Sequence, residues 1–102
     1  MDKPLIKITI AAAIEKDPLK DSIRKVSLFG SRADGGAKET SDIDVLIEFD
    51  PEAKIGFFKL AQIRRNMEDA VKKEVDLVTP EALSKYFRAD VLAGAETVYE
   101  KQ

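Results

Sequence analysis

The segment IDVLIEF, residues 43–49, constrains the fold of this sequence more than any other. Apart from Leu46, its apolar residues alternate with polar ones, as they do in a β-strand with one buried face. The face expected to be buried carries Ile43, Val45, Ile47 and Phe49. The other face would carry Asp42, Asp44, Leu46 and Glu48. We therefore expect a half-buried strand that presents two carboxylates at its start.

The rest of the chain predicts further short strands and helices. The expected elements are a helix over 4–16, strands over 25–29 and 74–79, a helix over 55–73 and a last helical stretch over 80–87. A strand stays open as the alternative at the N-terminus, because Ile6, Ile8 and Ile10 alternate. The segment 89–100 allows no assignment. This order predicts a single domain over residues 1–102 of the α/β (α+β) class, with a small mixed β-sheet flanked by helices.

The helix expected over 55–73 is the most regular of these elements. Its apolar stripe consists of Phe57, Leu60, Ile63, Met67, Ala70 and Val71. The opposite side carries Lys59, Arg64 and Arg65, which form either a solvated face or a contact with an acidic partner surface.

The residue types missing from the chain narrow its chemistry. The 102 residues include no histidine and no cysteine. Ser-His and Cys-His catalysis, disulfides and zinc sites of imidazole or thiolate are therefore excluded.

The formal net charge of −2 argues against broad binding of nucleic acid. No segment predicts a membrane span or a signal peptide, so we expect a cytoplasmic protein.

Three aspartates are candidates for a metal site. Asp42 and Asp44 are one residue apart in an extended segment, so their side chains share a face of the sheet. Asp76 lies inside the strand expected over 74–79, and it would join them if the two strands are neighbours. Clustered carboxylates repel one another unless a cation compensates, and Mg²⁺ takes oxygen ligands while leaving positions for phosphate oxygens and water.

A candidate phosphate site precedes these aspartates. The strand over 25–29 ends at Gly30, where the backbone can approach a phosphate closely, and the hydroxyl of Ser31 can donate to it. Arg32 can neutralise phosphate charge. A phosphate site beside a cluster of carboxylates is what nucleotidyl transfer requires, since metal ions bridge the triphosphate during an in-line displacement.

Each of these features is weak when it stands alone. The chain has ten aspartates, so one Asp-x-Asp is expected roughly by chance. Acids before a strand and Gly-Ser after one are most often ordinary turn residues. The combination carries the hypothesis: a strand, Gly-Ser, a short loop, Asp-x-Asp opening a second strand, and an aspartate inside a third.

The segments LFGSRADGGAKETSDIDVLIEF and EVDLVT together resemble the polymerase-β-type nucleotidyltransferase superfamily, and more narrowly its minimal nucleotidyltransferase (MNT) family. The resemblance implies the polymerase-β-like core fold and extends from about residue 23 to the C-terminus. It also implies that Gly30 and Ser31 hold a nucleoside triphosphate and that Asp42 and Asp44 ligate the metal ions. Asp76 is implied as the third metal ligand, which can help to deprotonate the acceptor hydroxyl.

The resemblance further implies a function and a partner. MNT proteins are typically paired with a HEPN-domain ribonuclease in toxin–antitoxin modules, and larger members of the superfamily carry extra domains that hold their acceptor. The implied activity is that of an antitoxin that transfers AMP from ATP to a tyrosine of its HEPN partner with Mg²⁺. Two alternatives stay open: a binding module that occludes its partner, and an enzyme that adds nucleotides to RNA. Asp34 stands where the family often has a second arginine, which favours the occluding module.

Overall fold

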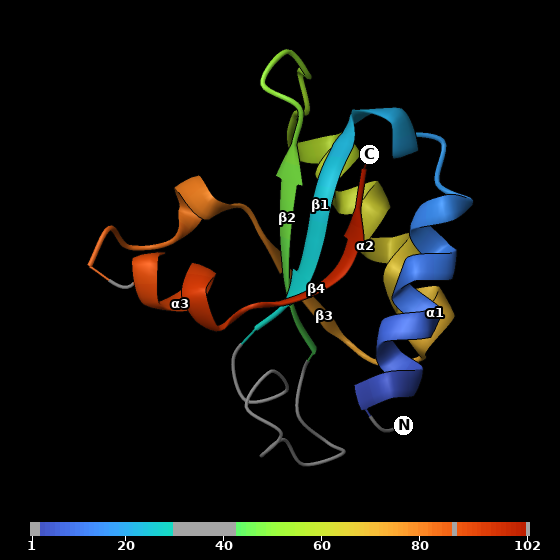
Figure 1. Ribbon diagram of the computed structural model, residues 1–102. Coiled ribbons are helices and arrows are strands. Elements are labelled where there is room, and N and C mark those ends of the chain that lie inside the picture. Colours follow the sequence, from blue (N-terminus) through green and yellow to red (C-terminus); the bar gives the residue numbers. More distant parts are fainter. Residues whose placement is uncertain (1–2, 30–42, 87, 102) are drawn as a thin grey trace.

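The computed structural model describes residues 3–29, 43–86 and 88–101. Its centre is a four-stranded sheet with the order β3-β2-β1-β4 (Figure 1). The strands are β1 (Ile23–Leu28), β2 (Ile43–Phe49), β3 (Val75–Val78) and β4 (Glu96–Glu100). β1 runs antiparallel to both β2 and β4, whereas β2 and β3 are parallel. The predicted mixed sheet is therefore confirmed.

Two helices cover one face of this sheet. They are α1 (Lys3–Glu15) and α2 (Phe57–Val71), which pack against each other as well as against the strands (Figure 1). α1 contributes Ile6, Ile10 and Ile14 to the core, and α2 contributes Ile63, Met67 and Val71. The strands contribute Ile23, Val26, Leu28, Ile43, Val45, Ile47, Val75 and Leu77. Because α2 connects β2 to β3 as a crossover helix, these two strands lie parallel.

The alternation in β2 holds except at one position. Ile43, Val45 and Ile47 are fully buried on the face that the helices cover. Leu46 belongs to the opposite face and is also buried, with 1% of its surface exposed. The one-turn 3₁₀ helix η3 (Pro80–Ala82) contacts β2, so the second face of the sheet is partly covered as well.

Two residues of the predicted apolar stripe on α2, Phe57 and Ala70, are not in the core. Phe57 is 79% exposed, whereas Leu60 packs against the core and Ile63 is fully buried. Phe57 begins α2 next to β3, which is the edge strand on that side of the sheet. Helical periodicity indicates the direction of a side chain, but it does not show where a helix extends past the strands that could cover it.

The C-terminal region differs from the sequence prediction. The expected helix over 80–87 is wrong, because η3 is followed by extended backbone at Leu83, with φ −80° and ψ 143°. The unassigned segment forms the short helix α3 (Arg88–Gly94) and then β4. The guanidinium of Arg88 donates to the carbonyl oxygen of Leu83 at 3.1 Å and so closes the turn between η3 and α3.

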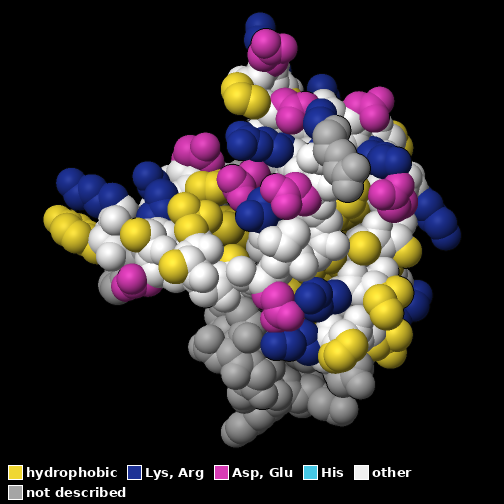
Figure 2. Space-filling view, in the orientation of Figure 1, with side chains coloured by type: hydrophobic (Ala, Val, Ile, Leu, Met, Phe, Trp, Pro, Cys, Tyr) yellow, Lys and Arg dark blue, Asp and Glu magenta, His cyan; other side chains and the backbone are white. Residues whose placement is uncertain are grey.

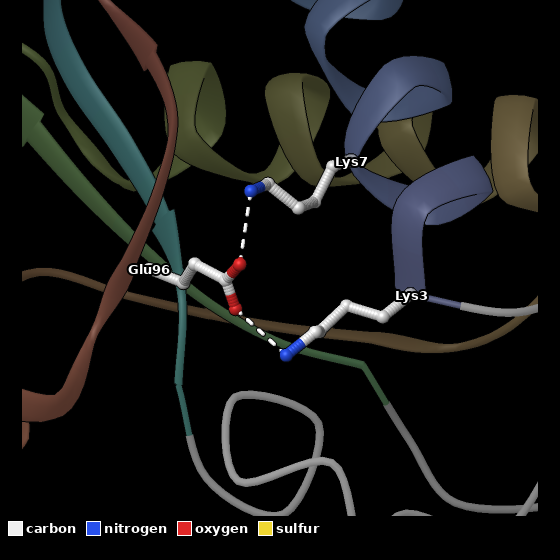
Figure 3. Close-up of polar contacts among 3 residues, drawn as sticks. All are labelled: Lys3, Lys7 and Glu96. Atoms are coloured by element: carbon white, nitrogen blue, oxygen red, sulfur yellow. Dashed lines mark hydrogen bonds and ion pairs between the residues drawn. The ribbon is translucent and has the colours of Figure 1, made fainter.

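A cluster of three charged residues attaches α1 to β4. Glu96 accepts hydrogen bonds from Lys3 and Lys7 at 2.9 and 3.0 Å (Figure 3). These two hydrogen bonds hold the pKa of Glu96 below its usual range, and the one from Lys3 contributes more than the one from Lys7. Since Glu96 pairs with Leu28 at the end of β1, this cluster fixes α1 beside the point where the candidate phosphate segment begins.

Candidate active site

Three strand ends meet at one end of the sheet, and the backbone holds them together. The N–H of Phe29, just after β1, donates to the carbonyl oxygen of Asp44 at 3.1 Å. The N–H of Ile43 donates to the carbonyl oxygen of Glu74 at 3.0 Å. The end of β1 and the starts of β2 and β3 are thereby adjacent, and Gly30 follows directly in the sequence.

The structure brings Asp44 and Asp76 to partner positions. They face each other in the parallel register of β2 and β3, between the buried pairs Ile43–Val75 and Val45–Leu77. Side chains alternate along each strand, so both carboxylates lie on the face of the sheet that is turned away from the helical core. Asp44 is partly buried, and Asp76 is exposed. Neighbouring strands are about 4.8 Å apart, which places the two carboxylates within reach of one ion.

The other predicted site residues lie outside the described part of the chain. These are Gly30, Ser31, Arg32 and Asp42, and Asp34 belongs with them. Within the three described ranges no group of three or more His, Cys, Asp or Glu side chains could hold a metal ion. The donor set that is described consists of two carboxylates, and carboxylate oxygen is the ligand type that Mg²⁺ prefers in proteins. Asp44 and Asp76 therefore fit a hard divalent cation.

A polar cleft begins beside Asp76, and the sequence analysis did not find it. Its volume is about 770 Å³, and it lies between the second half of α2 and the start of β3. The lining residues are Arg64, Glu68, Lys72, Lys73, Glu74, Val75 and Asp76. The only sequence signal for it was the run of charged residues between the helix and the strand that carries Asp76.

Two features fix the shape of this cleft. The carboxylate of Glu68 accepts the backbone N–H of Val75 at 2.9 Å, which ties α2 to the first residue of β3. Lys72 ends α2 in the left-handed region, with φ 60° and ψ 32°, and its N–H donates to the carbonyl oxygen of Glu68 at 2.8 Å. It is the one residue other than glycine with positive φ among those that the structure describes.

Charges of both signs are mixed on the surface. On the face that Figure 2 shows, Lys and Arg side chains alternate with Asp and Glu, and apolar side chains lie between them. A protein that follows a phosphate backbone without sequence preference needs a continuous positive groove. The face in view offers none outside the atoms drawn in grey.

Among the described residues, no helix has the length and apolar character needed to cross a membrane.

Comparison with known proteins identifies the class. The model of the family described as "Polymerase beta, Nucleotidyltransferase" matches residues 9–102. The chain therefore belongs to the polymerase β nucleotidyltransferase family, and it is a nucleotidyltransferase with the polymerase-β-like fold.

One relative and two solved structures illustrate the similarity. MJ0435 of Methanocaldococcus jannaschii, assigned as a protein adenylyltransferase, is 36% identical over 80 residues, which are 78% of this chain and 84% of that protein. A solved structure assigned as a minimal nucleotidyltransferase is 27% identical, with a TM-score of 0.75, and the match covers 95% of this chain and 94% of that one.

The second solved structure shares the fold at lower identity. It contains a tri-AMPylated HEPN toxin of Shewanella oneidensis in complex with an MNT antitoxin. The match has a TM-score of 0.67 at 18% identity and covers 98% of this chain and 74% of that one. The family and the enzyme class expected from the sequence are thus confirmed, and so is the fold.

Proposed function

We propose that this nucleotidyltransferase is an antitoxin that transfers AMP from ATP to a hydroxyl group, that of a tyrosine, on a partner HEPN-domain ribonuclease toxin. The observation that supports this most directly is the pairing of Asp44 with Asp76 on adjacent parallel strands. Two carboxylates at register positions next to each other, at the end of the sheet where β1 ends, support a shared metal site. The assignment of a relative as a protein adenylyltransferase and the MNT–HEPN complex among the structural neighbours support the choice of acceptor.

In the proposed site, Gly30, Ser31 and Arg32 bind the triphosphate, and Asp42, Asp44 and Asp76 hold Mg²⁺. When bound, Mg²⁺ supplies charge neutralisation for the triphosphate and for the oxygens that attack and leave. The exposed carboxylate of Asp76 accepts the proton of the acceptor hydroxyl. The hydroxyl oxygen forms a bond to the α-phosphorus of ATP, the bond from that phosphorus to the bridging oxygen breaks, and pyrophosphate leaves.

The test uses small amounts of this protein with Mg²⁺-ATP and an excess of a HEPN-domain toxin. We expect the toxin to gain the mass of AMP and to stay inactive after this protein is removed. Neutralisation that is one-to-one and independent of ATP would contradict the proposal and identify an occluding module. Label from ATP that enters RNA and not protein would instead identify an RNA-modifying enzyme.

A further inference from the structure

The cleft beside Asp76 does not end with its charged residues. Arg64 lines both this cleft and a smaller hollow of about 120 Å³ near the first turn of α2. The hollow is lined by Phe57, Leu60, Ala61, Arg64 and Leu77. α2 and β3 run side by side along the edge of the sheet, and the two depressions adjoin at Arg64. Together they are called the edge groove, with a charged end at Asp76 and an apolar end at Phe57.

We infer that this edge groove holds the acceptor, a protein segment that places an apolar side chain in the hollow and its hydroxyl group beside Asp76. The inference rests on the proposed function and deepens it, because it assigns the residues that select the acceptor. Continuity with Asp76 is the first argument. The acceptor oxygen has to reach this carboxylate, and the charged end of the groove is a surface depression that Asp76 lines.

The apolar end of the groove is the second argument. Phe57 and Phe58 are 79% and 88% exposed and contact each other edge to face, with ring centroids 6.0 Å apart. Exposed aromatic side chains at the rim of a small hollow are typical of protein interfaces, where a few such residues carry most of the binding energy. The hollow, of about 120 Å³, is smaller than the cavities of about 150 Å³ that hold benzene, so it suits one aliphatic side chain.

The balance of charge is the third argument, and it favours protein over RNA. The charged end contains three cations, Arg64, Lys72 and Lys73, and three carboxylates, Glu68, Glu74 and Asp76. The carboxylate of Glu68 is fixed there by the N–H of Val75, so it cannot turn away from a ligand without leaving that donor unpaired. A phosphate backbone needs a groove of one sign, whereas a polypeptide tolerates both signs.

The backbone at Lys72 is the fourth argument. Its φ of 60° is a conformation that glycine adopts without cost, and glycine is the usual residue at this position after a helix. A lysine here gives up stability in order to place a long cationic side chain in the groove. Departures from local preference of this kind occur at functional positions.

The test measures AMP transfer to short synthetic peptides that contain one tyrosine. Two peptides differ only in having leucine or serine next to the tyrosine, and oligoadenylate RNA is a third acceptor. We expect the wild-type protein to use the leucine peptide with kcat/KM about 10-fold higher than the serine peptide. Phe57→Ala removes one wall of the hollow and Ala61→Phe fills it, so each should abolish this preference while the Kd for Mg²⁺-ATP stays unchanged.

Tyr86→Ala is the matched control, because Tyr86 is also 79% exposed but does not line the groove. It should keep the preference, and thermal midpoints of all variants establish that they are folded. A preference that survives in both groove variants, or transfer to RNA in place of the peptides, would overturn the assignment of the groove. A wild-type protein that binds Mg²⁺-ATP but labels no acceptor would overturn the proposed function as well.

Discussion

Replacing Asp76 with asparagine changes the charge of this side chain but hardly its shape. Asp76 and Asp44 are register partners on adjacent strands, so their carboxylates are about 5 Å apart. Two unit charges at this distance repel each other by about 1 kcal/mol where water screens them well. Asp76 is exposed, so water screens the repulsion and this value for well-screened charges applies. Asp76→Asn should therefore leave the free energy of unfolding of the metal-free protein unchanged or raise it by up to about 1 kcal/mol.

The assay for this prediction has two parts. Thermal unfolding in EDTA should show a midpoint that is equal to that of the wild type or up to about 6 °C higher, because 1 kcal/mol shifts the midpoint of a domain of this size by about 4–8 °C. AMP transfer should fall by at least about 100-fold, since the acceptor hydroxyl loses its proton acceptor. Asp69→Asn is the control: Asp69 is also exposed but does not line the groove, and the loss of its charge should preserve transfer.

Either of two results would refute this reasoning. A midpoint clearly below that of the wild type would mean that Asp76 stabilises the fold, which is inconsistent with a carboxylate placed against a second one for function. Transfer that survives Asp76→Asn at a rate near that of the wild type would mean that the reacting hydroxyl does not depend on this carboxylate.

Three further predictions concern residues around the site. Lys72→Gly should raise the free energy of unfolding by about 0.5–1 kcal/mol in urea denaturation, because glycine adopts φ 60° without strain, whereas Lys73→Gly should lower it. Glu96→Gln should lower the thermal midpoint at pH 7, because the two lysines hold the folded-state pKa of Glu96 below its usual value of 4.5. The difference from the wild type should shrink as the pH falls from 4.5 and vanish once the pH is below the lowered folded-state pKa, and a difference that stays constant over this range would refute the role of the α1 lysines. Met67→Ala, at a fully buried position, should lower the free energy of unfolding by about 2–5 kcal/mol in urea denaturation. A loss below about 1 kcal/mol would contradict the place of Met67 in the core.

The sequence predicted those parts of the fold that depend on local periodicity. The bounds of β2 follow from its alternation, and the buried residues Ile63, Met67 and Val71 follow from the 3.6-residue period of α2. The pairing of Asp44 with Asp76 required only that their strands be neighbours. A helix that connects two strands of one sheet makes this the expected arrangement.

The sequence did not predict β4, and the reason is geometric. β4 pairs with β1 through a register shift between Val26 and Ser27, so Val26 faces Tyr99 while Ser27 faces Thr97. Such an irregularity breaks the alternation of buried side chains, and as a result the adjacent residues Val98 and Tyr99 both pack against the core. A search for period-two patterns therefore does not recognise this strand.

The edge groove escaped prediction for a related reason. The residues that line it come from α2, β3 and the turn between them, and periodicity assigns each of these elements a buried face and an exposed face. It does not say that β3 is the last strand on that side of the sheet. The exposure of Phe57, and with it the apolar end of the groove, follows from this position at the edge.

The same position bears on what kind of acceptor the site can serve. A carboxylate on an interior strand has a neighbouring strand on each side, and a large acceptor could approach it only from above the sheet. Asp76 lies on the edge strand β3, so one flank is occupied by Asp44 on β2 and the other opens into the groove along α2. A side chain projecting from a folded protein can therefore reach Asp76 from the side. An occluding module would have no use for two register-paired carboxylates with one flank left open in this way.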